Sequence, residues 1–110
     1  MRFISKLYLG ETVQKKQERL VSRLKKHKLL PGTYVICLPE GGSAPLEYMK
    51  AGELYKSWYD RHEPWVIGIA GDEDEAIALI SQIIKDCMIK TGSLSLRSYA
   101  VSLLDAGRES

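Results

Sequence analysis

One segment of the chain, Pro64-Trp65-Val66-Ile67-Gly68-Ile69-Ala70-Gly71, runs directly into four acidic residues and a long apolar stretch. Its apolar run has the length of a buried strand, and the closing glycine permits a tight turn. Asp72 and Glu75, which follow, have the D-x-x-E spacing of a helix-capping arrangement. The segment therefore predicts a strand over 65–70, a turn and a helix over 72–91, which is the βα unit of an α/β fold.

A glycine turn before a helix is also how many proteins bind nucleotide phosphates, through free N–H groups and the helix dipole. Here the spacing Gly68-Ile69-Ala70-Gly71 lacks the full G-x-G-x-x-G pattern. The four acids, Asp72 to Glu75, already place negative charge at the helix start. At separations of about 4–6 Å, each acid would repel a phosphate by about 1 kcal/mol. We therefore expect a turn whose carboxylates cap their own helix and exclude an anionic ligand.

The rest of the chain continues the alternation of strands and helices. In chain order, the expected elements span residues 2–9, 12–29, 33–38, 43–62, 65–70 and 72–91. This β-α-β-α-β-α order predicts a single α/β domain over residues 1–110, with a three-stranded, mainly parallel sheet. Residues 93–104 fit either a short C-terminal helix, which we predict, or an edge strand. An α+β fold, with Ser93–Leu96 or residues 2–9 as an antiparallel edge, is the alternative.

The bulk composition fits a globular domain. Of 110 residues, 45% are hydrophobic and 27% are charged, which is ordinary for such a domain. No apolar run approaches the roughly 18 residues of a membrane span, and no leader-like apolar segment opens the chain. We therefore expect a cytoplasmic protein without membrane contact.

The usual marks of catalysis are missing from the sequence. The two cysteines, Cys37 and Cys87, lie within apolar runs, match no metal-ligand spacing and are expected in the core. The two histidines, His27 and His62, fall near the ends of predicted helices, at the opposite edge of the sheet from Cys37. A catalytic thiol needs a nearby base or a positive field. We therefore expect no cofactor and no catalytic residue, and we favour a protein that is not an enzyme.

Charge is divided unevenly along the chain. Residues 1–39 contain nine Lys and Arg against two acids, whereas residues 40–110 contain seven basic and twelve acidic residues. Most of the cations fall in the predicted helix 12–29, where they could contact nucleic-acid phosphates or an acidic partner. The alternative is an ordinary solvated helix face, because no aromatic residue interleaves the cluster. The candidate contact residues are Lys15, Lys16, Arg19, Arg23 and Lys26.

The predicted carboxyl edge of the sheet, where ligands of open α/β sheets bind, holds two further candidate sites. Gly41, Gly42 and Ser43 are a candidate ligand site, because glycine lets a backbone approach a ligand closely. A plain flexible connection explains the same residues. Glu40 and Asp72 are a candidate Mg²⁺ or Ca²⁺ site, since carboxylates suit these ions. Acids in a first helical turn also simply complement the helix dipole.

Aromatic residues cluster in the predicted second helix. Tyr48, Tyr55 and Tyr59 are spaced by seven and four residues, on one side of a helix over 43–62, and Trp58 lies on an adjoining stripe. One helix buries only one stripe against a sheet, so the other would expose Tyr or Trp, which favour protein interfaces. Burial of both stripes under the C-terminal segment is the alternative. We predict that these four residues form the self-association interface of a homo-oligomer.

Three functions of different classes follow from these features. The first is a non-enzymatic interaction or accessory domain that self-associates. The second is a nucleic-acid-associated factor that uses helix 12–29, and the third is a small enzyme or ligand sensor with its site at the carboxyl edge of the strands. We rank them in this order because the sequence carries no paired base and nucleophile, no metal-ligand spacing and no phosphate loop.

Overall fold

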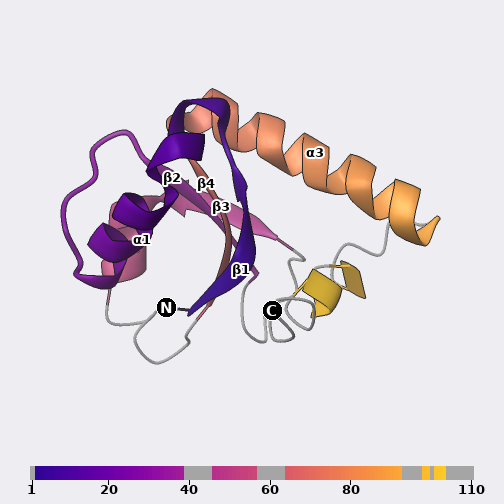
Figure 1. Cartoon of the computed structure of the whole chain (residues 1–110), viewed down its shortest axis with the longest axis horizontal. Helices are drawn as coiled ribbons and strands as arrows, with labels where there is room; N and C mark the ends of the chain where they lie inside the picture. The colour runs from indigo at the N-terminus through magenta and orange to yellow at the C-terminus, as the bar shows by residue number, and fades with distance from the viewer. Residues whose placement is uncertain (1, 39–45, 57–63, 93–97, 100, 104–110) are drawn as a thin grey trace.

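The computed structural model describes residues 2–38, 46–56, 64–92, 98–99 and 101–103 (Figure 1). Its strands are β1 (Arg2–Leu9), β2 (Tyr34–Leu38), β3 (Glu47–Lys50) and β4 (Trp65–Ala70). Its helices are α1 (Gln17–Lys25) and α3 (Glu73–Thr91), with the 3₁₀ helices η1 (Glu11–Lys16) and η2 (Ala51–Tyr55). Residues 98, 99 and 101–103 are also helical. Among the described residues, no helix combines the length and the apolar character that crossing a membrane requires.

The four described strands form one mixed sheet in the order β1-β4-β2-β3. β1 runs parallel to β4, whereas β2 is antiparallel to both β4 and β3. The predicted α/β class is confirmed, but the predicted three-stranded, mainly parallel sheet is wrong. β3 adds a strand at the edge of the sheet, and β2 begins beside the end of β4, where Tyr34 pairs with Ala70, so it runs against β1 and β4.

The helix predicted over 43–62 is wrong within the described residues. Glu47–Lys50 is instead a strand in which Tyr48 lies opposite Ile36, and the following Ala51–Tyr55 is a 3₁₀ helix. Exposure alternates along Glu47–Lys50, which is the two-residue period of a strand. Four residues are too few for this period to stand out from the longer helical spacing of the tyrosines. Pairing with β2 decides the structure of this segment.

The other predicted elements are present, some with shifted ends. Helix 12–29 is α-helical over Gln17–Lys25 and begins as η1, while helix 72–91 is present as α3. The predicted strands 2–9, 33–38 and 65–70 correspond to β1, β2 and β4. The predicted C-terminal helix is present where that segment is described, and the alternative edge strand at Ser93–Leu96 lies outside the described residues.

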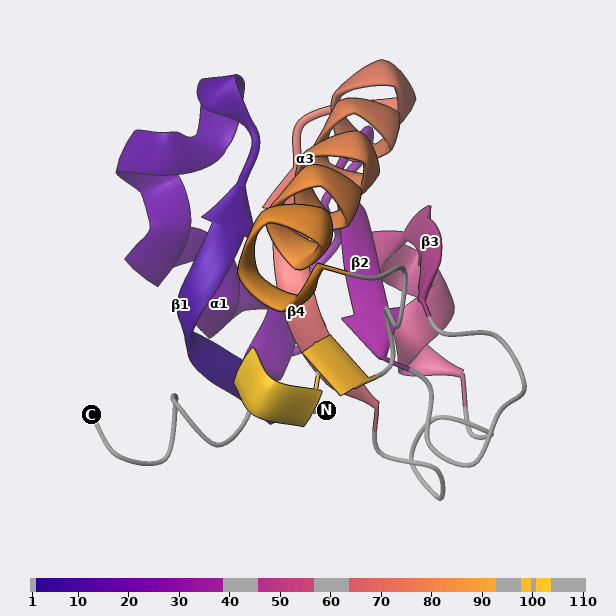
Figure 2. The ribbon, with the colours of Figure 1, turned by 90° about the vertical axis from the view of Figure 1, so that its right-hand side faces the viewer.

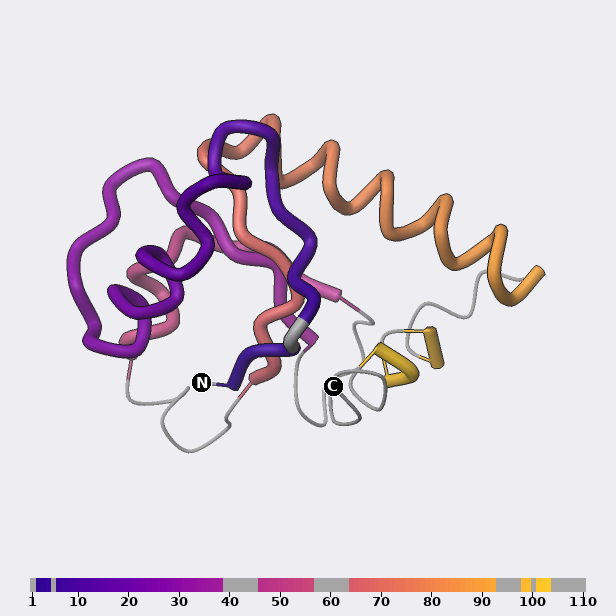
Figure 3. Tube along the Cα trace, viewed as in Figure 1, coloured from indigo at the N-terminus to yellow at the C-terminus, as the bar shows by residue number. Residues whose placement is uncertain are grey.

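Helices cover both faces of the sheet (Figure 2). α3 lies on one face, where Ile36, Ile67 and Ile83 belong to one buried cluster. α1 and η2 lie on the other face, where Leu24 and Val66 belong to a second buried cluster. Figure 3 follows the chain from β1 through η1 and α1 into β2, and finally through β4 into α3. Coverage on both faces explains why β2 and β4 are apolar along almost their whole length.

The glycine within β4 serves the packing of neighbouring strands. Ile67 is the extra residue of a bulge, and Gly68 beside it lies opposite Ile36 of β2. A Cβ atom on Gly68 would lie 3.0 Å from the carbonyl oxygen of Tyr8 on β1. Gly68 therefore allows β1 and β4 to approach closely, which accounts for this glycine without a ligand.

Candidate nucleic-acid interface

α1 has one buried side and one charged side. Leu20 and Leu24, four residues apart, are buried against the sheet. Arg19, Arg23 and Lys26 follow at helical spacing on a flank of the helix, and all three are exposed. Since four residues rise by about 6 Å along a helix, these cations form a row along the outer side of α1.

All five predicted nucleic-acid contact residues lie on the exposed surface of η1 and α1. Lys15 and Lys16 are exposed at the end of η1, directly before α1. The cationic face, as we call this surface, comprises Lys15, Lys16, Arg19, Arg23 and Lys26.

The positive charges of the cationic face are not neutralised within the described part of the chain. There, no carboxylate lies within 4.0 Å of its amines and guanidiniums, although Lys56 elsewhere forms an ion pair with Glu53 at 2.5 Å. Like charges four residues apart on a helix, such as Arg19 and Arg23, destabilise it by about 0.2–0.5 kcal/mol per pair. These charges are therefore available to an anionic partner, which would relieve their repulsion.

Two open depressions lie on the cationic face itself. One, of about 440 Å³, is lined by Lys15 and Arg19 and also by Glu18, so it combines both signs of charge. The other, of about 530 Å³, is lined by Arg19, Arg23 and Lys26 and, beyond the helix, by Leu29. Both volumes fall within the roughly 300–1,000 Å³ of ligand sites. The cations therefore surround recessed surface as well as projecting from the helix.

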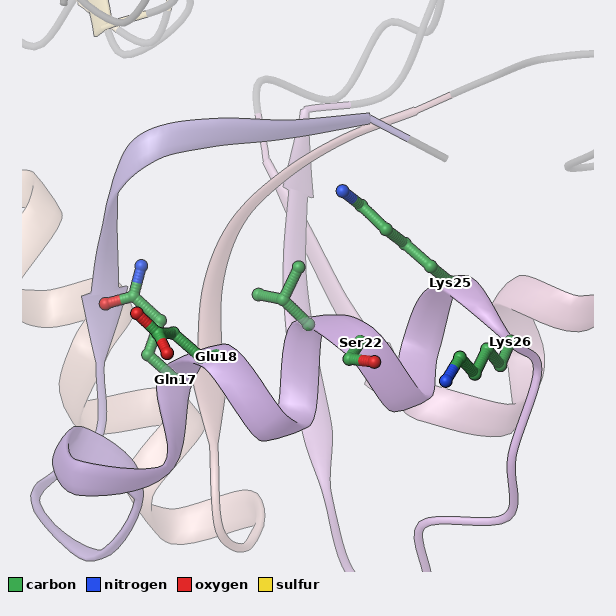
Figure 4. A pocket seen from close by; sticks show the side chains of 6 residues that line it. Gln17, Glu18, Ser22, Lys25 and Lys26 are labelled. Carbon is green, nitrogen blue, oxygen red and sulfur yellow. The ribbon is translucent and has the colours of Figure 1, made fainter.

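A third depression, of about 420 Å³, lies on the flank of α1 (Figure 4). Gln17 and Glu18 are at one end and Lys25 and Lys26 at the other, and Val21 also lines it. Val21 is half-buried and packs against the buried cluster on the side of the sheet that α1 covers. This recess combines both signs of charge with an apolar floor, so it is less suited to an anion than the cationic face.

α1 ends in a Schellman motif with an unusual residue at its centre. The N–H of His27 donates to the carbonyl oxygen of Leu24 at 3.1 Å, and the N–H of Lys28 donates to that of Arg23 at 3.0 Å. His27 has a φ of 54°, in the left-handed region where glycine is the usual residue. A non-glycine residue in this conformation costs about 1–2 kcal/mol. The chain therefore holds a side chain at this point at the expense of stability.

The imidazole of His27 stacks on the ring of Tyr55. The ring centroids are 4.6 Å apart and the planes differ by 18°. The Tyr55 hydroxyl donates to the carbonyl oxygen of Lys28 at 2.6 Å, and burial raises the pKa of this hydroxyl. η2 thus places an aromatic pair at the C-terminal end of the cationic face. No pattern in the sequence had indicated the contact between Tyr55 and His27, because Tyr55 lies near α1 only when β3 pairs with β2.

The aromatic residues predicted as an interface do not share a helix. Tyr48 lies on β3, where it is 39% exposed and its ring centroid lies 6.3 Å from that of Tyr34. Tyr55 lies on η2, and Trp58 and Tyr59 lie outside the described residues. The expected common helical face is therefore absent, and self-association stays a prediction.

The turn between β4 and α3 is filled by one of the chain's own carboxylates. Glu75 accepts hydrogen bonds from the Gly71 N–H and from the Thr12 hydroxyl, each at 2.9 Å. Asp72 Oδ1 accepts from the Glu75 N–H at 2.8 Å, so the expected capping arrangement is present. The Glu75 carboxylate lies where a phosphate would approach the free N–H groups of the helix start.

The predicted ligand and metal sites stay predictions, although the end of β2, at Leu38, lies beside the start of β4 and so at the opposite edge of the sheet from Asp72. Glu40 and Gly41-Gly42-Ser43 lie outside the described residues. Asp72 is engaged as the helix cap. Among the residues that the structure describes, no three His, Cys, Asp or Glu side chains gather as a metal site would require.

The buried titratable groups of the sheet contribute to packing. Cys37 is fully buried, and this burial raises the pKa of its thiol well above the usual value. The Tyr8 hydroxyl donates to Asp86 Oδ2 at 2.6 Å and lies 2.9 Å from the Tyr99 hydroxyl. Burial, and then these hydrogen bonds, raise the pKa of Tyr8. Both groups are held neutral, so neither is an activated nucleophile.

Comparisons of the chain with known protein families, curated proteins and solved structures gave no match. The interpretation of the site therefore depends on its own geometry and charge.

Proposed function

We propose that the protein binds nucleic acid through the phosphates, on the cationic face of η1 and α1. The observation that carries this proposal is a row of exposed cations that no carboxylate neutralises in the described part of the chain. Release of condensed counterions makes contacts between such cations and phosphates favourable. The depression lined by Arg19, Arg23 and Lys26 would let a phosphate approach several cations at once.

The shape of the cationic face favours a linear polyanion. From Arg19 to Lys26 it follows the axis of α1 for roughly 10 Å. One strand of duplex DNA presents a phosphate about every 3.4 Å along its axis, so a strand along α1 would bring several phosphates within reach. An acidic protein segment is the competing partner, and the experiment below separates the two.

The self-associating module ranked first on sequence becomes the second candidate, because its aromatic helix is absent. Exposed apolar side chains still favour it: Ile77 and Met88 on α3 are 45% and 44% exposed. Together with Ile84 they are spaced by seven and four residues, along one flank of α3. Such exposed apolar surface is typical of interaction sites. Sedimentation that shows only monomer at about 100 μM, well above the micromolar range of ordinary complexes, would remove this candidate.

The test of nucleic-acid binding is fluorescence anisotropy with a labelled oligonucleotide of about 20 nucleotides over a series of salt concentrations. We expect the triple variant Arg19→Glu, Arg23→Glu, Lys26→Glu to lose affinity by about 100-fold. For the wild-type protein, the logarithm of the binding constant should fall steeply with the logarithm of the salt concentration. A steep slope identifies phosphate contacts.

The matched control is the triple variant Lys50→Glu, Lys85→Glu, Lys90→Glu, which changes three exposed lysines of β3 and α3. It alters the net charge equally but leaves the cationic face intact, so most of the affinity should remain. Equal losses in the two triple variants would contradict the proposal, since net charge alone would then explain binding. Tighter binding of polyglutamate than of the oligonucleotide would assign the face to acidic proteins instead.

A further inference from the structure

The C-terminal end of the cationic face has a feature that phosphate binding alone does not explain. The imidazole of His27 stacks on Tyr55 with 4.6 Å between the ring centroids. Tyr55 lies against one face of the imidazole, and the side chain of His27 nevertheless stays exposed. An exposed flat ring beside a row of cations is the arrangement on which proteins stack the bases of a single strand.

Two sets of contacts fix this stacking platform, by which we mean the rings of His27 and Tyr55. The Tyr55 hydroxyl donates to the carbonyl oxygen of Lys28 at 2.6 Å, and this hydrogen bond holds the ring of Tyr55 in place. The Schellman hydrogen bonds at the end of α1 hold His27 at a φ of 54°. Glycine would adopt this conformation without strain, so the helix does not need an imidazole in order to end. A strained residue that persists on a charged surface is an indication of function.

Cations and an apolar residue neighbour His27 in the chain. Lys26 and Lys28 flank His27 in the chain, and both line the depression of about 530 Å³, together with Arg23 and Leu29. Leu29 is 83% exposed, so this depression offers apolar surface beside its charges. A single strand presents phosphates and base faces along its length, and this end of the cationic face has partners for both.

We infer that the nucleic acid held by the cationic face is single-stranded, with one base stacked on the imidazole of His27. The inference rests on the proposed function and adds the class of ligand. A duplex keeps the faces of its bases inside the stack, so it can offer phosphates to the cationic face but no base to His27. Because every base has a π face, stacking of this kind is tolerant of sequence.

The experiment compares three labelled probes of equal length by fluorescence anisotropy. They are a thymidine oligonucleotide, the corresponding abasic strand, which has the same phosphates without bases, and a duplex. The wild-type protein is expected to bind the thymidine strand about tenfold more tightly than the abasic strand, since stacking of one base contributes a factor of this order.

His27→Asn is the informative variant, because asparagine tolerates the left-handed conformation and removes the ring. It is expected to bind the thymidine strand as weakly as the abasic strand, with the affinity for the abasic strand unchanged from the wild type. Tyr48→Ala removes an exposed aromatic side chain outside the cationic face and should leave all three affinities unchanged.

Equal binding of the thymidine and abasic strands by the wild-type protein would overturn the inference while leaving phosphate binding in place. An undiminished preference in His27→Asn would also overturn it, as would tighter binding of the duplex than of the thymidine strand. Failure of the wild-type protein to bind any of the three probes would overturn the proposed function itself.

Discussion

α1 and α3 use their charged residues in opposite ways. The acids at the start of α3 are engaged within the fold, since Asp72 caps the helix and Glu75 binds Gly71 and Thr12. The cations along α1 have no carboxylate partner in the part of the chain that the structure describes. A charge that is hydrogen-bonded at a helix end stabilises the fold, whereas a row of like charges opposes it. The difference indicates which charges serve the structure and which are free to serve a partner.

The C-terminal ends of the two helices differ in the same sense. α3 ends at Gly92 with a φ of 71°, and glycine adopts this conformation without strain. α1 ends at His27 with a φ of 54°, where the side chain adds strain. α3 is therefore built for stability at both ends, while the outer side of α1 carries features that oppose it. Substitutions of charged residues in α3 should therefore lower stability, whereas those in α1 should mainly lower binding.

The largest effect on stability is expected at Glu75. Glu75→Ala removes the acceptor of the Gly71 N–H and of the Thr12 hydroxyl. We expect the free energy of unfolding, measured in urea, to fall by about 2 kcal/mol. Glu73→Ala, which changes an exposed acid of the same turn, is the control and should cost less than about 0.5 kcal/mol. Oligonucleotide affinity should not change in either variant. A loss of affinity would contradict the view that the acids of α3 serve the fold and not binding.

A smaller effect is expected at Gly10, which lies against the same carboxylate. A Cβ atom at Gly10 would overlap the Glu75 carboxylate, which would have to leave its position. Gly10 has a φ of −60°, so alanine fits the backbone without strain. We expect Gly10→Ala to cost about 1–2 kcal/mol in the wild-type protein and almost nothing in Glu75→Ala. Additive losses in this double-mutant cycle would show that alanine disturbs the backbone instead of the carboxylate.

On α1, a substitution of a charged residue should increase stability instead of lowering it. Arg19→Glu places an acid in the first turn of α1 and converts repulsion from Arg23, four residues later, into attraction. We expect the free energy of unfolding to rise by about 0.5 kcal/mol while oligonucleotide affinity falls by about tenfold. Arg19→Gln should give an intermediate result in both measurements. A destabilised Arg19→Glu protein would show that this arginine supports the fold.

The predictable and unpredictable parts of the molecule differ in the range of the interactions that determine them. The strand over 65–70 and the cap at Asp72 depend on neighbours in the sequence, so an apolar run and a D-x-x-E spacing were enough to predict them. The row of cations on α1 was visible for the same reason. β3 depends on pairing with β2, and its four residues show too little alternation to reveal a strand. The contact of Tyr55 with His27 follows from that pairing, so no local pattern could have indicated the stacking platform.

A near-neutral change in stability is expected for His27→Gly, and this variant separates the role of His27 in the fold from its role in binding. Glycine relieves left-handed strain of about 1–2 kcal/mol, but it increases the freedom of the unfolded chain and loses the stack on Tyr55, each by about 1 kcal/mol. These contributions nearly cancel, so the free energy of unfolding should change by less than about 1 kcal/mol. The preference for a thymidine strand over an abasic strand should nevertheless disappear, because the ring that a base would contact is gone. A loss of stability above about 2 kcal/mol would instead make His27 a structural link between α1 and η2, and its contrast with Gly92 would no longer point to a ligand.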